Sequence, residues 1–275
     1  MRDEENKVDT NEVEENKDMY DMNGMNNSNE MNENEEMEEF EGETSSAIVK
    51  MANIIFSPTE AFKAIKAKPN WLIPLLITMF APVVYYLVCW GQFEVSMIKE
   101  IEKQLEGSGQ VMTESMMELP LTIAKVSTFV FTPIGVLIGM LFVAFIYFVV
   151  AKIVKSPAGF KQIFSMTVHI GILSVFTWLI MMVMTLIKGE MPTVAVTSLS
   201  SLLPESMDGS ILSAVLAPIE VISLWSLYIT FVGLRVVASL SKKAAGIIVG
   251  LSFLFGASIS VITLLLANMA SSMQM

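Results

Sequence analysis

The chain has 275 residues, 53% of them hydrophobic, and a mean hydropathy of +0.59. This composition exposes too much apolar surface for a protein surrounded by water, so lipid must cover part of it. Residues 1–45 carry seventeen of the 28 acidic side chains and three of the 17 basic ones, which makes this segment −14 and the remainder +3. The single cysteine, Cys89, excludes an intrachain disulfide, a cysteine-based metal cluster and a redox pair.

Residues 1–46 form the first predicted region, an acidic cytoplasmic tail. They consist mainly of Asn, Glu, Asp and Met, with almost no branched apolar residues. Such a segment buries too little surface to offset the entropy of ordering, so we predict disorder. An alternative is a helix formed on a partner, with its methionines along one side. The start of the chain is acidic, not basic and then apolar, so we expect the first membrane span to direct targeting.

Residues 47–70 are predicted to include an amphipathic helix in the headgroup region. Ser57 suits the N-cap, Pro58 the first helical position, and Glu60 completes a capping box. Phe62 and Ile65 share one side of the helix, and lysines lie nearby. The alternative is an ordinary helix start that leads into the first span.

Residues 71–268 predict an all-α fold, a polytopic membrane bundle of five transmembrane helices. Each apolar segment is close to the roughly 20 residues that cross a bilayer. The predicted spans cover residues 71–90, 126–151, 163–187, 211–236 and 244–266. The loop after the first span includes a second amphipathic helix, predicted over residues 97–106 outside the bilayer.

The basic residues predict the orientation, because positive flanks stay on the cytoplasmic side. One side collects Lys50, Lys63, Lys66, Lys68, Lys152, Lys155, Lys161, Arg235, Lys242 and Lys243. The other side collects Lys99, Lys103, Lys125 and Lys188. We therefore expect a cytoplasmic amino terminus, an outer carboxyl terminus, and anionic headgroups near Lys63, Lys66, Lys68, Lys152, Lys155, Lys161, Lys242 and Lys243.

Glu220 and His169 are the candidate intramembrane polar residues. Glu220 is the one acidic residue deep inside a predicted span, where an ionisable group must be neutral, paired or hydrated. Pro218 removes a helix hydrogen bond nearby and predicts a kink. Helical rise places His169 and Glu220 about 15 Å apart in depth, so no direct relay is expected. Each residue is either a proton or ligand site or a structural group.

Small residues and prolines recur within the spans. Gly135 and Gly139 form one GxxxG step, and Gly246 and Gly250 form another, which predicts close helix packing in the bundle or at a dimer contact. The alternative is a substrate path, to which proline bends in three spans would contribute.

No catalytic signature is present: we find no GxxxxGK[ST], HExxH or GxSxG sequence and no paired intramembrane aspartates. We therefore expect no enzyme activity, no cofactor and no metal. Basic and aromatic residues are spread among spans and loops, which favours lipid contact over a nucleic-acid surface.

Several short segments resemble the Yip family, the Ypt/Rab-interacting membrane proteins, and its bacterial members in particular. They are Ile55-Phe56-Ser57-Pro58-Thr59-Glu60-Ala61-Phe62, Pro69-Asn70-Trp71-Leu72-Ile73-Pro74-Leu75-Leu76, Ala158-Gly159-Phe160-Lys161-Gln162, and residues 219–234 with Leu224-Trp225-Ser226-Leu227 and Gly233-Leu234. The resemblance implies five spans, a bacterial cell membrane and the orientation given above. Eukaryotic members bind small GTPases, but this chain lacks their Asp-Tyr-Gly-Pro type motif.

These patterns predict a non-enzymatic membrane scaffold. Its basic inner face would hold anionic lipid, and its acidic tail would recruit a cytoplasmic protein. The alternative function is a permease or channel subunit that uses Glu220 and the proline bends as a polar path.

Overall fold

The computed structural model describes residues 47–106, 114–192 and 194–273. The chain divides into two units, Met1–Ser46 and Ala47–Met275, and the predictions made for the tail lie outside the described residues. In the described part every regular element is helical, apart from one isolated β-bridge between Ser198 and Glu220. The predicted all-α class is therefore confirmed.

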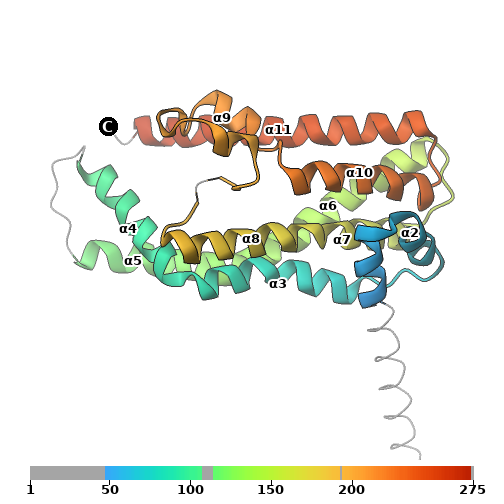
Figure 1. Ribbon diagram of the computed structural model, residues 1–275, viewed down its shortest axis with the longest axis horizontal. Helices are drawn as coiled ribbons and strands as arrows, with labels where there is room; N and C mark the ends of the chain where they lie inside the picture. The colour runs from blue at the N-terminus through green and yellow to red at the C-terminus, as the bar shows by residue number, and fades with distance from the viewer. Residues whose placement is uncertain (1–46, 107–113, 193, 274–275) are drawn as a thin grey trace, which may run out of the picture. The chain divides into compact units, whose positions relative to one another are not determined.

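A first helix covers Ala47–Phe56 and is followed by a series of helices along the second unit (Figure 1). The α-helices are α2 (Pro58–Ala67), α3 (Leu72–Val88), α4 (Trp90–Glu106), α5 (Glu114–Val126), α6 (Thr132–Ile153), α7 (Phe160–Gly171), α8 (Leu173–Lys188), α9 (Ile211–Leu216), α10 (Val221–Val236) and α11 (Lys242–Met273). A π-helical turn, η1 (Ser127–Phe131), joins α5 to α6, and two 3₁₀ turns, η2 (Leu199–Leu202) and η3 (Glu205–Met207), precede α9.

Three helical stretches are long and apolar enough to cross a membrane: Met117–Ile153, Phe160–Lys188 and Lys242–Met269. A fourth crossing is possible if α3 and the first part of α4, which meet at an angle of 73°, count as one span. The described chain thus has three or four candidate spans by length and composition, which makes it a multi-pass membrane protein.

The predicted fourth span, residues 211–236, is not one helix. It consists of α9 and the 16-residue α10, with residues 217–220 between them. Pro218 contributes to the break, because its nitrogen has no hydrogen to donate to a helix carbonyl, and Ala217 before it, the C-cap of α9, still has helical backbone angles. Pro133 lies within the continuous helical stretch Met117–Ile153, two residues after the π-helical turn, a local irregularity of the kind that often accompanies proline in a helix. Pro82 lies inside α3.

The apolar side of α2 packs on protein. Phe62 and Ile65 are fully buried where α2 contacts α7 and α10. Ser57 takes the N-cap and Pro58 the first position as predicted, but the capping box is wrong. The Ser57 side chain makes no capping hydrogen bond, and Glu60 instead binds Lys63 at 2.7 Å.

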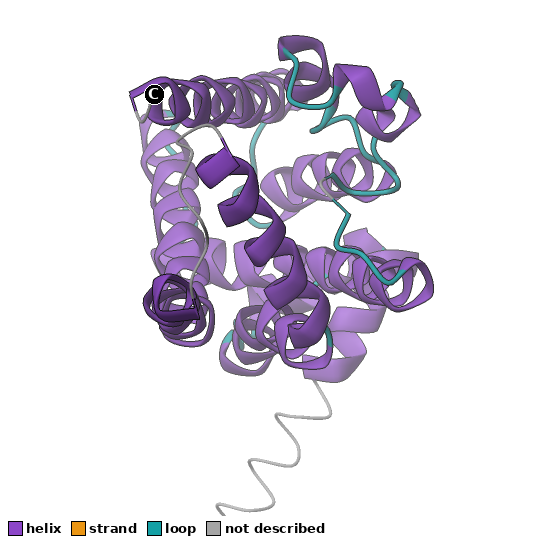
Figure 2. Cartoon of the chain, turned by 90° about the vertical axis from the view of Figure 1, so that its left-hand side faces the viewer, coloured by secondary structure: helices purple, strands orange, loops and turns teal. Residues whose placement is uncertain are grey.

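The predicted tight packing at the glycine steps is also wrong for contacts within the described residues. A Cβ atom added at Gly135, Gly139, Gly246 or Gly250 would meet nothing within 4 Å. α11 contacts α9 and α10, and most of its remaining surface is exposed (Figures 1 and 2). Close approach occurs at Gly233 instead, where an added Cβ would lie 2.9 Å from both Phe62 and Met166.

Candidate functional site

Glu220 lies at the break between α9 and α10, in extended backbone at the N-cap of α10. Residues 197–199 run beside it, and the Leu199 amide donates to the Ile219 carbonyl at 2.9 Å. The single hydroxyl hydrogen of Ser198 is shared between the Ala217 carbonyl at 2.9 Å and the Leu216 carbonyl at 3.2 Å, and the Leu216 carbonyl also accepts from the Ile219 amide at 3.0 Å. The loop before α9 therefore completes the hydrogen bonding of the broken span.

Both carboxylate oxygens of Glu220 accept hydrogen bonds from hydroxyl groups. Thr197 donates to Oε1 at 2.8 Å, Thr177 of α8 donates to Oε1 at 3.3 Å, and Ser223 of α10 donates to Oε2 at 2.9 Å. The side chain is buried, with the residue only 7% exposed. Hydroxyl donors and the N-terminal end of α10 both stabilise a carboxylate, so this break is a polar site built around one acidic group.

A cavity of about 290 Å³ adjoins this group between α6, α7, α8 and α10. Its polar lining consists of hydroxyl side chains: Thr167, Ser174, Thr177, Ser223 and Ser226. Thr177 and Ser223 also hold Glu220, so the carboxylate lies directly behind the lining. Hydroxyl oxygens and one carboxylate can bind water, a proton or a small cation. No cluster of three or more His, Cys, Asp or Glu side chains that could hold a metal ion occurs among the described residues.

His169 belongs to a different buried group. Its Nδ1 donates to the Ser165 carbonyl at 2.7 Å, and its Nε2 is buried without a hydrogen-bond partner in the described chain. Ser165 donates to the Asn70 carbonyl at 2.9 Å, and the Asn70 side-chain oxygen accepts from Lys50 at 2.9 Å. These hydrogen bonds link the first helix to α7 beside the start of α3.

No hydrogen bond joins His169 to Glu220. Glu220 binds Thr177, which lies eight residues after His169 along the α7–α8 span, or about 12 Å of helical rise. The structure thus places the two candidates in separate polar groups.

The segments that carry the ten predicted inner-side basic residues meet at one end of this unit, which is the end of α2 in Figure 1. The ammonium group of Lys66 donates to the Val236 carbonyl at 3.0 Å and to Ser239 at 2.8 Å, and Gln162 donates to the Lys66 carbonyl at 2.8 Å. Lys99 binds Glu190 at 3.0 Å at the other end of α8. Basic side chains exposed at the α2 end are Lys63, Lys68, Lys152, Lys155, Lys161, Arg235, Lys242 and Lys243.

Two of the predicted lipid-facing lysines have protein partners that matter for the fold. Lys66 caps the C-terminus of α10, where a cation also interacts favourably with the helix dipole. Lys152 donates to the Ser156 carbonyl at 3.3 Å and lies over the ring of Phe148 at 5.3 Å.

Sequence reasoning singled out Glu220 as a candidate but did not predict its hydrogen-bond partners. Ser223 follows Glu220 by three residues, a spacing that was available as a local signal. Thr197 and Thr177 lie 23 and 43 residues away. Only the fold brings them together. The one sequence signal that could have pointed to this segment is its hydroxyl-rich run at residues 197–201, because Ser and Thr side chains can bond to free backbone groups.

The helical architecture defines the chain as a multi-pass membrane protein with a buried polar site. The Yip1 domain matches residues 52–265, so the chain belongs to the Yip1 domain family. The chain is 25% identical over 205 residues to the membrane protein YknW of Bacillus subtilis (strain 168), a match that covers 74% of this chain and 85% of the relative. No solved structure matches the chain.

Proposed function

We propose that this protein is a non-enzymatic scaffold of the bacterial cell membrane. Its basic end holds anionic headgroups, and its acidic tail recruits a cytoplasmic protein. The observation that carries the proposal is the gathering of the cationic segments at one end of the second unit, the end at which Ala47 continues from the tail. A surface of this charge attracts anionic lipid at about 1 kcal/mol per basic residue.

The hydrogen bonding of Glu220 supports a scaffold over a transporter. Three hydroxyl groups satisfy a carboxylate that a helix break has placed at an N-cap. An arrangement of this kind stabilises a fixed fold. It also explains why an acidic residue is tolerated within a membrane protein without any transport role.

The proposal includes five membrane crossings with a cytoplasmic amino terminus. The α3–α4 pair and the three long helices account for four of these crossings, and the proposal assigns the fifth to the broken segment of α9 and α10. Single cysteines introduced at Lys161 and Asp208 in a Cys89→Ala background test this arrangement in intact cells. We expect a membrane-impermeant maleimide to label Asp208→Cys only. Labelling of both positions, or of Lys161→Cys alone, would contradict the orientation.

The recruiting role is tested by affinity capture from cell membranes solubilised in mild detergent. Three forms are compared: the full chain, a chain lacking residues 1–46, and a full chain with every tail Asp and Glu changed to Asn or Gln. We expect a protein captured by the full chain to be lost from both altered forms. Equal capture by all three forms would rule out recruitment by tail charge.

The second candidate function is a permease or channel subunit, favoured by the cavity beside Glu220, whose mostly apolar lining includes five hydroxyl side chains. Ion or proton flux into vesicles containing the purified protein distinguishes the two functions. For a scaffold, we expect no flux above that of empty vesicles and normal partner capture by Glu220→Gln. Flux that Glu220→Gln abolishes in a normally folded protein would instead establish transport.

A further inference from the structure

A second hollow, outside the polar site, lies beside α8. It has a volume of about 760 Å³ and opens between the first helix, α8 and α10, with Ile77 of α3 at one edge. The side of the first helix that faces it carries Ile48, Met51, Ala52, Ile55 and Phe56. We call this hollow the α8–α10 groove.

The lining of the α8–α10 groove excludes polar occupants. Every lining side chain is apolar, and the α8 and α10 contributions include Phe176, Leu179 and Trp225. A peptide in extended form would leave its backbone groups unpaired there, at a cost of several kcal/mol for each group. Water is excluded for the same reason, because it needs polar partners.

The side chains also disfavour a partner helix. Helices associate within membranes through small residues that let backbones approach and through polar side chains that hydrogen-bond across. The groove offers mostly Ile, Leu, Val, Phe and Trp, with Ala52 as its one small residue. A flexible hydrocarbon chain can pack against these apolar side chains without small residues or polar groups in the groove.

The exposure of the first helix, Ala47–Phe56, indicates what kind of apolar molecule fits the groove. Phe56 is 83% exposed and Ile48 is 53% exposed, although this ten-residue helix is too short to span a bilayer. Exposed apolar side chains favour contact with hydrocarbon over water, and this helix lies at the same end of the unit as α2 (Figure 1). Ile48 and Phe56 line the groove, so a molecule in it contacts the helix that lies nearest the lysine-bearing end.

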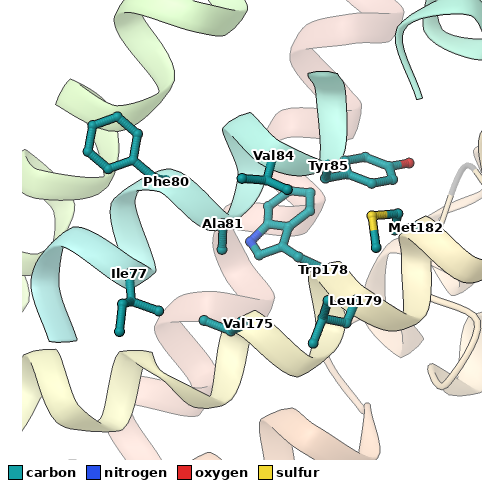
Figure 3. A pocket seen from close by; sticks show the side chains of 9 residues that line it. All are labelled: Ile77, Phe80, Ala81, Val84, Tyr85, Val175, Trp178, Leu179 and Met182. Atoms are coloured by element: carbon teal, nitrogen blue, oxygen red, sulfur yellow. The ribbon is translucent and has the colours of Figure 1, made fainter. Parts of the chain in front are cut away.

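A smaller hollow continues the groove along α3 and α8. Figure 3 shows it lined by residues of these two helices, with Ile77 at one end, Trp178 in the middle, and Tyr85 and Met182 at the other end. The two hollows share Ile77, Val175 and Leu179. A chain that enters beside the first helix thus has a further apolar surface to follow toward the centre of the membrane.

We propose that the α8–α10 groove is a binding site for one acyl chain of a phospholipid, whose headgroup lies at the lysine-bearing end. The site involves the helix that connects the tail to the bundle, so an occupied groove would hold that helix in place. This inference goes beyond the scaffold function and does not depend on tail recruitment.

The test is native mass spectrometry of the full-length protein, purified in mild detergent and supplied with dioleoyl phosphatidylglycerol. We expect a single phospholipid to remain bound after excess detergent has removed the surrounding lipid. Ala52→Phe fills the groove and should weaken retention at least about fivefold, or about 1 kcal/mol at 1.4 kcal/mol per tenfold. Ile259→Phe adds the same ring to the exposed α11 and is the matched control, with wild-type retention expected.

A second measurement uses Trp225 in a chain whose other three tryptophans are changed to phenylalanine. A phospholipid brominated along its acyl chains should quench this fluorescence after detergent washing, and Ala52→Phe should relieve the quenching. Complete loss of lipid from the wild type, or equal retention and quenching in Ala52→Phe, would overturn the proposal. So would a disulfide between copies carrying Ala52→Cys in the Cys89→Ala background, which would place the grooves of two chains against each other.

Discussion

Two regions of the second unit differ in how tightly their side chains pack. Around α2, α7 and α10, side chains interlock so closely that Phe62 is fully buried and Gly233 has no room for a methyl group. Along α6 and α11, the glycines face open space and large apolar side chains are exposed. The difference shows that protein packing holds the first region, whereas lipid can complete the second.

The largest expected effect comes from truncating the packed region. Phe62→Ala should lower the free energy of unfolding by about 3–5 kcal/mol, because it leaves a cavity among fully buried neighbours. Phe255→Ala on α11 removes the same ring from a side chain that is 56% exposed, so its effect should be much smaller. Reversible unfolding in mixed micelles measures both. Equal losses would show that α11 is packed as tightly as α2.

A smaller effect is expected from adding one methyl group to each region. Gly233→Ala should destabilise the protein by about 1–3 kcal/mol, because the new Cβ would press on Phe62 and Met166. Gly135→Ala should be neutral or stabilising by up to about 1 kcal/mol, since alanine favours the helix and meets no neighbour. The same unfolding assay compares the two. A destabilising Gly135→Ala would show that another helix occupies that face in the membrane.

A substitution in the polar site around Glu220 should change the free energy of unfolding by an intermediate amount. Thr197→Val removes the shorter of the two hydrogen bonds to Oε1 of Glu220 and should cost about 1–3 kcal/mol, because a buried carboxylate loses a donor. Thr197→Ser keeps the hydroxyl and is the control. If the valine variant is as stable as the serine variant, the carboxylate does not depend on this loop.

The smallest effect is expected at the exposed ion pair of Lys99 and Glu190. The hydrogen bond and charge of Lys99 hold the pKa of Glu190 below its usual range. A lowered carboxyl pKa stabilises the folded state above the unfolded pKa of about 4.3, and this contribution disappears as pH falls through the folded value. Melting temperatures of wild type and Glu190→Gln should therefore differ slightly at neutral pH and converge as pH falls through the lowered pKa of Glu190. A constant difference across this range would contradict the ion pair.

Much of the architecture follows from local sequence. The helical class, the positions of the long apolar helices and the start of α2 at Ser57 and Pro58 could be predicted because each depends on composition or on neighbouring residues. Pro218 likewise indicated an irregularity in the fourth predicted span. Its full extent was missed, because a kink and a complete break look alike without the loop that satisfies the freed carbonyl groups.

Side-chain partners were harder to predict. The sequence does not show that Phe62 and Ile65 turn toward α7 and α10, because an amphipathic helix buries its apolar side equally well in lipid or in protein. The prediction of tight packing at the glycine steps was wrong for a related reason. A GxxxG spacing permits close approach, but it does not specify which helix approaches.

The hydrogen bond from Lys66 to Val236 joins residues 170 positions apart. A ribosome adding about 5–20 residues per second would need roughly 10–30 s to make the intervening chain. During that interval the apolar side of α2 has no α10 to pack against. Biogenesis must therefore keep α2 in a temporary location, at the membrane surface or on a chaperone, until the later helices have been inserted.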